Sequence, residues 1–172
     1  PLFPYTTLFR SLEHALHFLS THGIREIAIN LHHKSKKIID YFGDGKDFGV
    51  NLYFSKEERI LGTAGGIKKL QPFFKNETFL VINSDVLADV DLNDVLNFHK
   101  EKKSKLTLVV RQDPNAEKYD SIQRVEEGRI VHFLGHSIKN SEPTTQVMFT
   151  GIQIMEPEIF SRDRKSTRLN SS

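Results

Sequence analysis

The 172-residue sequence contains no cysteine, which excludes disulfides and thiolate metal sites. It has no apolar run that approaches the roughly 20 residues of a membrane-spanning helix, and no signal peptide is visible. With 38% hydrophobic and 27% charged residues, its composition is that of a globular domain of ordinary size. We therefore expect a cytoplasmic protein that does not act in a membrane.

A basic patch of the kind that binds nucleic acid is also missing. The formal net charge is +2, but residues 161–172 hold four basic residues against Asp163, and Arg10 adds another. The residues between these ends therefore carry a small negative charge, which does not suit a phosphate backbone. We expect no nucleic-acid partner.

The two ends of the chain differ in character from its interior. Residues 1–11, PLFPYTTLFRS, show no clear hydrophobic period, and residues 161–172, SRDRKSTRLNSS, are polar. Both segments resemble translated adapter sequence. We predict that residues 1–11 and 161–172 are non-native, that residues 12–160 are authentic, and that the parent protein continues on both sides of them.

Strand and helix patterns alternate through the first two thirds of the interior. Apolar runs predict strands at residues 25–30, 50–55, 78–83 and 105–111. Helical spacing predicts helices from Leu12 to Gly23, within residues 34–45, from a cap at Thr63 to near Pro72, and after a cap at Asp91. The alternation indicates βαβ units, and hence a three-layer α/β fold with a mostly parallel central sheet.

The alternation of strand and helix patterns ends after residue 115. Residues 121–134, SIQRVEEGRIVHFL, form two alternating runs around Glu127 and Gly128, which predicts a β-hairpin. Residues 146–155, QVMFTGIQIM, predict one more strand, and Pro157 then opens a helix. We expect this antiparallel addition to join the parallel core in one continuous unit.

Two short stretches in the middle of the chain suggest a ligand site. Residues 61–66 read LGTAGG, and Asp85 follows the apolar run in FLVINSDVL, residues 79–87. In open α/β sheets, ligands bind beyond the carboxyl ends of the strands. Mg²⁺ is held there by only one or two carboxylates together with substrate phosphates, and small residues let a base or ribose approach the backbone. Thr63 would begin a helix whose N–H groups favour anions. The two stretches are interpreted as halves of one nucleotide site.

Each stretch also has a plain structural explanation. The glycines can be no more than a loop-to-helix junction, and Asp85 can be a turn residue that satisfies nearby amides. Their order along the chain favours the functional interpretation.

Five segments, in order, resemble the sugar-1-phosphate nucleotidyltransferases, especially the mannose-1-phosphate guanylyltransferase-like and bacterial uridylyltransferase-like members. They are GIREIAINLHH, LGTAGGIKK, FLVINSDVL, EEGRIVHFL and FTGIQIMEPEIF, and the likeness as a whole runs from about Leu12 to Phe160. The resemblance implies a Rossmann-like nucleotidyltransferase fold, of which residues 12–160 would be a partial domain. It also implies a reaction that joins a nucleoside triphosphate to a sugar 1-phosphate and releases pyrophosphate.

The resemblance assigns roles to particular residues. The base and ribose would lie against Gly62, Thr63, Ala64 and Gly65. Asp85 would be the catalytic acid that binds Mg²⁺, and Thr150 and Gly151 would form the wall of the sugar pocket.

Departures from the family pattern limit what this chain is expected to do. The family's N-terminal Gly-rich loop should lie upstream of Leu12, and its second metal-binding Asp beyond Phe160. A Tyr-Gly pair is replaced by Tyr119 and Asp120, and a Glu-Lys-Pro motif by Leu134, Gly135 and His136. We therefore predict that the 172-residue chain is inactive although its parent is an enzyme.

Two other functions stay open. One is a metal-dependent glycosyltransferase of similar α/β architecture, in which residues 89–91, DVD, would hold the metal. The other is a non-catalytic regulatory subunit that binds a nucleotide or nucleotide sugar. The sequence favours guanine or uracil without choosing between them, leaves the sugar undefined, and leaves a homo-oligomer open.

Overall fold

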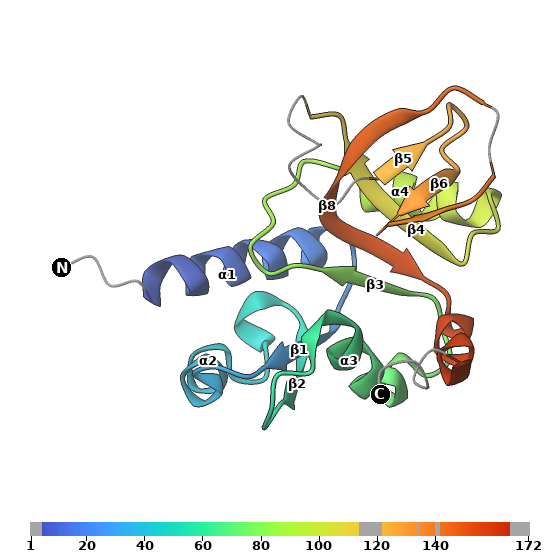
Figure 1. Cartoon of the computed structure of the whole chain (residues 1–172). Helices are drawn as coiled ribbons and strands as arrows, with labels where there is room; N and C mark the ends of the chain where they lie inside the picture. The colour runs from blue at the N-terminus through green and yellow to red at the C-terminus, as the bar shows by residue number, and fades with distance from the viewer. Residues whose placement is uncertain (1–4, 114–121, 134, 140–141, 166–172) are drawn as a thin grey trace.

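The computed structural model describes residues 5–113, 122–133, 135–139 and 142–165 (Figure 1). Its α-helices are α1 (Tyr5–Thr21), α2 (Ser35–Phe42), α3 (Gly62–Lys69) and α4 (Leu92–Glu101). Its strands are β1 (Glu26–Leu31), β2 (Asn51–Lys56), β3 (Phe79–Ile82), β4 (Leu106–Arg111), β5 (Ile122–Arg124), β6 (Ile130–Phe133), β7 (His136–Ser137) and β8 (Thr145–Met155). Short 3₁₀ helices are η1 (Lys46–Phe48), η2 (Gln71–Phe74) and η4 (Pro157–Lys165).

The strands form two separate sheets in the part of the chain that the structure describes. β1 and β2 pair in parallel, with Glu26 opposite Asn51 and Leu31 opposite Lys56. The six other strands form one antiparallel sheet around β8, which is the longest strand. β8 pairs with β3, β4 and β5, so it joins the core strands to the hairpin (Figure 1).

The prediction of a mostly parallel central sheet is therefore wrong. β3 and β4 do follow the alternating pattern, but β8 lies between them and runs against both. Alternation along the sequence specifies which segments are strands and which are helices. It does not show that a strand from the end of the chain inserts between two earlier ones, because that pairing is non-local.

The predicted hairpin is confirmed. β5 and β6 are antiparallel, and the turn closes with the Gly128 N–H donating to the Val125 carbonyl at 3.0 Å. Gly128 adopts a φ of +91°, which a residue with a Cβ rarely takes. β5 then docks on β8, with Ile122 opposite Val147, so the hairpin extends the larger sheet.

The main core lies between α1 and the strands. Leu12, Leu16 and Leu19 on one face of α1 are buried, as their helical spacing predicts. The same cluster includes Ile29 from β1 and Ile152 from β8, so it reaches both sheets; partly buried Leu80 and Ile82 of β3 pack against it. A second, smaller cluster stacks Phe74, Phe79 and Phe160, with the ring centroids of Phe74 and Phe79 3.8 Å apart.

Helix α1 begins at Tyr5, within a segment for which the sequence showed no period. The centroid of the Phe9 ring in this helix lies 4.8 Å from the centroid of the Tyr41 ring. Whether residues 1–11 are native stays a prediction. Tyr119, Asp120 and Leu134, which depart from the family motifs, lie outside the described residues. In the described part of the chain, no helix has both the length and the apolar character needed to cross a membrane.

Candidate functional site

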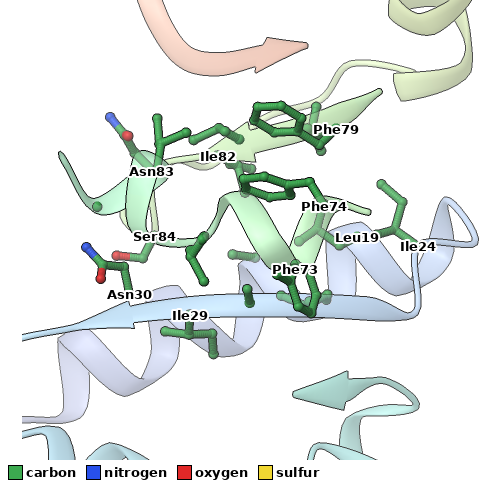
Figure 2. Close-up of a pocket in the computed structure, with 18 of the residues that line it drawn as sticks. Leu19, Ile24, Ile29, Asn30, Phe73, Phe74, Phe79, Ile82, Asn83 and Ser84 are labelled. Carbon is green, nitrogen blue, oxygen red and sulfur yellow. The ribbon is translucent and has the colours of Figure 1, made fainter. Parts of the chain in front are cut away.

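The two sequence stretches that suggest a site follow strands that end on the same side of the molecule. Figure 2 shows Asn30, near the end of β1, and Asn83 and Ser84, just after β3, at one end of the same cavity. Ile24 and Phe79, which lie near the starts of these strands, are at the other end. The carboxyl ends of β1 and β3 therefore meet at one edge, where α/β proteins bind ligands.

The glycine turn lies at this edge. Helix α3 starts at Gly62, whose φ of +69° suits glycine, and Gly62, Thr63 and Ala64 are all exposed. The prediction that Thr63 caps the helix is wrong, because Leu61 is the cap residue and no side chain caps it. The first turn of the helix thus presents its backbone at an exposed surface.

A buried glutamate holds this turn in place. One oxygen of Glu57 accepts from the Leu61 N–H at 3.0 Å, and the other accepts from the Asn30 amide at 2.8 Å. The bond from the Leu61 N–H, followed by the bond from Asn30, holds the pKa of the Glu57 carboxyl below its usual value. Glu57 therefore connects the end of β1 to the start of α3 as a carboxylate.

Sequence reasoning missed this pair, although a signal was present. Asn30 falls near the end of one predicted strand, and Glu57 lies just past the next. Polar residues at these strand ends lie beside the expected ligand site for the same reason as Asp85.

Gly66 is required by the same contact. A Cβ on Gly66 would lie 2.4 Å from the Asn30 side-chain nitrogen and 3.0 Å from a Glu57 oxygen. Its backbone φ is ordinary for a helix, so the reason for glycine here is space. The last glycine of LGTAGG thus lets α3 lie directly on the Asn30–Glu57 pair.

Asp85 lies in a tight loop after β3. The Asn83 N–H donates to the Gly151 carbonyl at 2.9 Å, and the Val86 N–H donates to the Asn83 carbonyl at 3.2 Å. These bonds fix the loop on either side of Asp85, whose own side chain is exposed. No described residue forms a hydrogen bond or ion pair with its carboxylate. The loop therefore offers free carboxylate oxygens, the ligand type that Mg²⁺ prefers, and this donor fits a site completed by substrate phosphates.

Thr150 and Gly151 lie on β8 beneath this loop. Gly151 has a φ of +90°, and a Cβ there would lie 2.7 Å from Val86 Cγ2 and 3.0 Å from the Asn83 amide nitrogen. The Thr150 hydroxyl donates to the Val109 carbonyl at 2.8 Å. Gly151 thus lets the Asp85 loop rest on β8, while the Thr150 hydroxyl is already used to join β8 to β4.

The predicted site residues divide between two cavities. Gly62 and Thr63 line a large cavity of about 1140 Å³ together with Asn83 and Ser84. Asp85, Thr150 and Gly151 line a smaller one of about 610 Å³, and Asn83 lines this one too. Ala64 and Gly65 line neither cavity. The structure therefore brings the two halves of the site to either side of Asn83.

The DVD segment has a different role from the one a glycosyltransferase would give it. Asp91 caps α4, accepting from the Asn93 N–H at 2.8 Å, as the sequence predicts. This bond is the main reason why the pKa of Asp91 lies below its usual value. Over the described ranges, no three His, Asp or Glu side chains gather into a metal site.

An α/β fold with an exposed glycine turn and a free acid beyond neighbouring strand ends has the arrangement in which such folds bind ligands. Comparison with known protein families identifies the family of this chain. The profile of the family described as Nucleotidyl transferase matches residues 1–171, and the chain belongs to this family.

The relatives with curated names are sugar-1-phosphate nucleotidyltransferases. A UTP–glucose-1-phosphate uridylyltransferase from Synechocystis sp. is 34% identical over 86% of this chain. A mannose-1-phosphate guanylyltransferase from Mycobacterium tuberculosis is 30% identical over 88% of it. In each case the chain spans 41% of the relative's length.

A solved structure supports the fold. HddC from Yersinia pseudotuberculosis, complexed with GMP-PN, superposes with a TM-score of 0.70 at 21% identity. The match covers 87% of this chain and 64% of that one. At this identity the likeness establishes the shared fold.

Proposed function

We propose that the protein to which this chain belongs joins a nucleoside triphosphate to a sugar 1-phosphate, giving a nucleoside-diphosphate sugar and pyrophosphate. The observation that carries this proposal is the meeting of the glycine turn and the Asp85 loop on either side of Asn83. Family membership and the names of the relatives support it.

Different candidate site residues would have different roles in such a reaction. The exposed turn of Gly62, Thr63, Ala64 and Gly65 would lie against the base and ribose, held in place by Glu57. Asp85 would hold Mg²⁺, which neutralises charge on the phosphates when it is bound. Thr150 and Gly151 would form the wall of the sugar pocket through their backbone and shape, because the Thr150 hydroxyl is engaged with Val109.

The chemistry needs no covalent enzyme intermediate. An oxygen of the sugar phosphate attacks the α-phosphorus, the bond between that phosphorus and the bridging oxygen to the β-phosphate breaks, and pyrophosphate leaves. Catalysis of this kind consists of positioning and charge stabilisation. We further propose that the protein works in the cytoplasm and that the 172-residue chain alone does not turn over.

Nucleotide titration of the chain tests the proposal. GTP and UTP, each with MgCl₂, are titrated while backbone amide signals are followed by NMR. We expect saturable shifts at residues 62–66 and 83–86, and a Mg²⁺-dependent part that Asp85→Asn removes and the matched variant Asp89→Asn keeps. If no triphosphate and no nucleotide sugar shifts either segment, the proposal fails. Pyrophosphate release by the chain alone would refute its predicted inactivity.

The two alternatives are weaker for specific reasons. In a glycosyltransferase, Asp91 would be a metal ligand, yet its carboxylate is committed to capping α4. A non-catalytic binding subunit would use the same turn. It is distinguished by a parent protein that binds the nucleotide and releases no pyrophosphate.

A further inference from the structure

The smaller of the two cavities, which we call the Asp85 cavity, has a mostly apolar wall. Its volume of about 610 Å³ lies within the roughly 300–1,000 Å³ range of small-molecule sites. Hydrophobic side chains make up most of its lining, including Val86, Leu87, Val109, Val110, Met148 and Phe149. Among the described residues that line it, Arg111 is the one with a positive charge. Arg111 has no part in the reaction proposed above.

Arg111 lies at the edge of the sheet where the candidate site residues meet. It is the last residue of β4. β3 and β4 both pair antiparallel with β8, so they run parallel to each other and their carboxyl ends lie at the same edge. Asp85 follows the end of β3. The acid and the arginine therefore approach one cavity from two strand ends, which is where α/β folds place ligand-binding groups.

A β-bulge in β8 sets the position of Arg111 along that strand. The pairing of β4 with β8 changes register between Leu108 and Val110, so the three residues 150–152 of β8 lie opposite one residue of β4. Arg111 consequently pairs with Met148. Bulges are common beside active sites, where they redirect side chains. This bulge shifts the end of β4 by two residues along β8, to the far side of the segment proposed as the sugar wall.

The guanidinium of Arg111 is accessible to a ligand. Its Nη2 donates to a carboxylate oxygen of Asp113 at 2.9 Å, and the Arg111 side chain is 61% exposed against 17% for Asp113. The carboxylate is thus the more buried partner, and the guanidinium is the end that reaches solvent. An ion pair with this exposure contributes little stability, and a guanidinium has five N–H donors. Arg111 can therefore bind a second anion while Asp113 keeps it oriented.

A phosphate is the anion that suits this position. A guanidinium binds two oxygens of a phosphate through two parallel hydrogen bonds, and apolar surroundings strengthen such bonds. The glycine turn lies at the larger cavity, on the other side of Asn83, so a nucleotide held there leaves the Asp85 cavity to the second substrate. The second substrate is the sugar 1-phosphate, and its phosphate is the charged part.

We propose that Arg111 binds the phosphate group of the sugar 1-phosphate. This inference rests on the proposed function and adds a substrate-binding residue to it. Asp113 orients the guanidinium, and the guanidinium holds the phosphate in the same cavity as Asp85. The positive charge of Arg111 offsets the repulsion between this phosphate and the phosphates of the nucleotide, which the attacking oxygen has to approach.

Binding of sugar phosphates to the 172-residue chain tests this role. The probes are α-D-glucose 1-phosphate, α-D-mannose 1-phosphate, inorganic phosphate and free glucose. Each is titrated without nucleotide, while NMR follows the Arg111 side-chain Nε–H and the backbone amides of residues 109–111 and 148–151. Arg111→Gln removes the charge, and Arg111→Lys keeps the charge but loses the planar fork. Lys105→Gln is the matched control, because Lys105 is 57% exposed, lies just before β4 and pairs with Glu158.

We expect the three phosphates to shift the Arg111 signals, and Arg111→Gln to weaken their binding by about tenfold or more. Arg111→Lys should retain part of the affinity, and Lys105→Gln should retain all of it. Free glucose should give the same response with wild type and with Arg111→Gln, because it carries no charge. The proposal is overturned if no phosphate shifts the Arg111 signals, if Arg111→Gln binds the sugar phosphates as wild type does, or if Lys105→Gln loses as much affinity.

Nucleotide titration separates this role from the proposed function. Arg111→Gln should leave the response of residues 62–66 to GTP and UTP unchanged. A normal triphosphate response, together with sugar-phosphate affinity that Arg111→Gln does not change, would overturn the role of Arg111 alone. Absence of any triphosphate response, together with sugar-phosphate binding that depends on Arg111, would overturn the proposed function alone.

Discussion

Gly151 shows how a single residue positions the candidate metal loop. Its φ of +90° is unfavourable for other residues by roughly 1–2 kcal/mol, and an added Cβ would also meet Val86 Cγ2 at 2.7 Å. We expect Gly151→Ala to lose that amount and a further 1–3 kcal/mol or so from overpacking. Urea unfolding measures the loss. Gly23→Ala is the matched control, because Gly23 has a φ of +79° and open space around it. Equal losses in the two variants would show that the loop does not rest on Gly151.

Glu57 makes the stability of the glycine turn depend on pH. Its pKa is lowered in the folded chain from the ordinary 4.5, so its carboxylate stabilises the fold above that value. This contribution is lost as the pH falls through the lowered folded pKa. We expect wild type to exceed Glu57→Gln in unfolding free energy at pH 7, and the difference to shrink steadily below about pH 4.5. Comparing the two proteins cancels the other carboxylates, and a difference that does not change between pH 7 and pH 3 would contradict the assignment.

The contact of α3 with Asn30 of β1 explains why α3 has a glycine at position 66. The Cβ of Gly66→Ala would displace the Asn30 side chain, so we expect a loss of about 1–3 kcal/mol. In an Asn30→Ala background the two Asn30 contacts are gone and only the Glu57 oxygen at 3.0 Å remains, so the same change should cost clearly less, since alanine also favours helices. A double-mutant cycle in urea measures this coupling. Additive losses would mean that α3 does not rest on Asn30.

A buried histidine joins α4 to the larger sheet. His99 is 1% exposed; its Nδ1 lies 2.7 Å from the Thr107 hydroxyl on β4, and its Nε2 lies 3.0 Å from a Glu156 oxygen just after β8. Thr107→Val would leave a buried ring nitrogen unpaired, so we expect a loss of about 1–3 kcal/mol. Thr78→Val is the control, because its hydroxyl bonds to the same Glu156 at an exposed position. Thermal unfolding should show the smaller effect for the control, and the opposite order would refute this role for His99.

The elements themselves were predictable from the sequence, because each depends on local spacing. The run at 25–30 became β1 and the run at 105–111 became β4, each within one residue. Pairing was not predictable, since β3 meets Met155 and Ile154 of β8, more than seventy residues further along the chain. The local hydrophobic periodicity of β3 or β8 gives no information about which strand each one pairs with.

The candidate site was likewise predictable only in part. Motif order located the glycine turn and Asp85, and the structure puts them near one edge. The helix start was predicted wrongly at Thr63: the helix begins at Gly62, after Leu61, whose N–H is bonded to Glu57. That contact comes from β1 and β2 being neighbours, and it becomes visible only once the strands are paired.

At the scale of the whole molecule, β1 and β3 each have one unpaired edge over the described residues, since β1 pairs with β2 alone and β3 with β8 alone. Unpaired edges with apolar neighbours are templates for pairing with other chains, and charges or prolines are the usual protection against this. β1 carries one charge, Glu26, whereas β3 (Phe79–Ile82) carries neither a charge nor a proline. We therefore expect the 172-residue chain to self-associate as its concentration rises.

Sedimentation over a range of protein concentrations measures this association. Leu80→Pro should reduce it, because proline removes a donor from the open edge, the position where strands tolerate proline. Val81→Pro is the contrasting variant. Its N–H faces β8, so it should destabilise the fold before it affects association. A wild-type chain that stays monomeric at every concentration, or association that Leu80→Pro leaves unchanged, would show that these strand edges are not the surfaces through which copies of this chain meet.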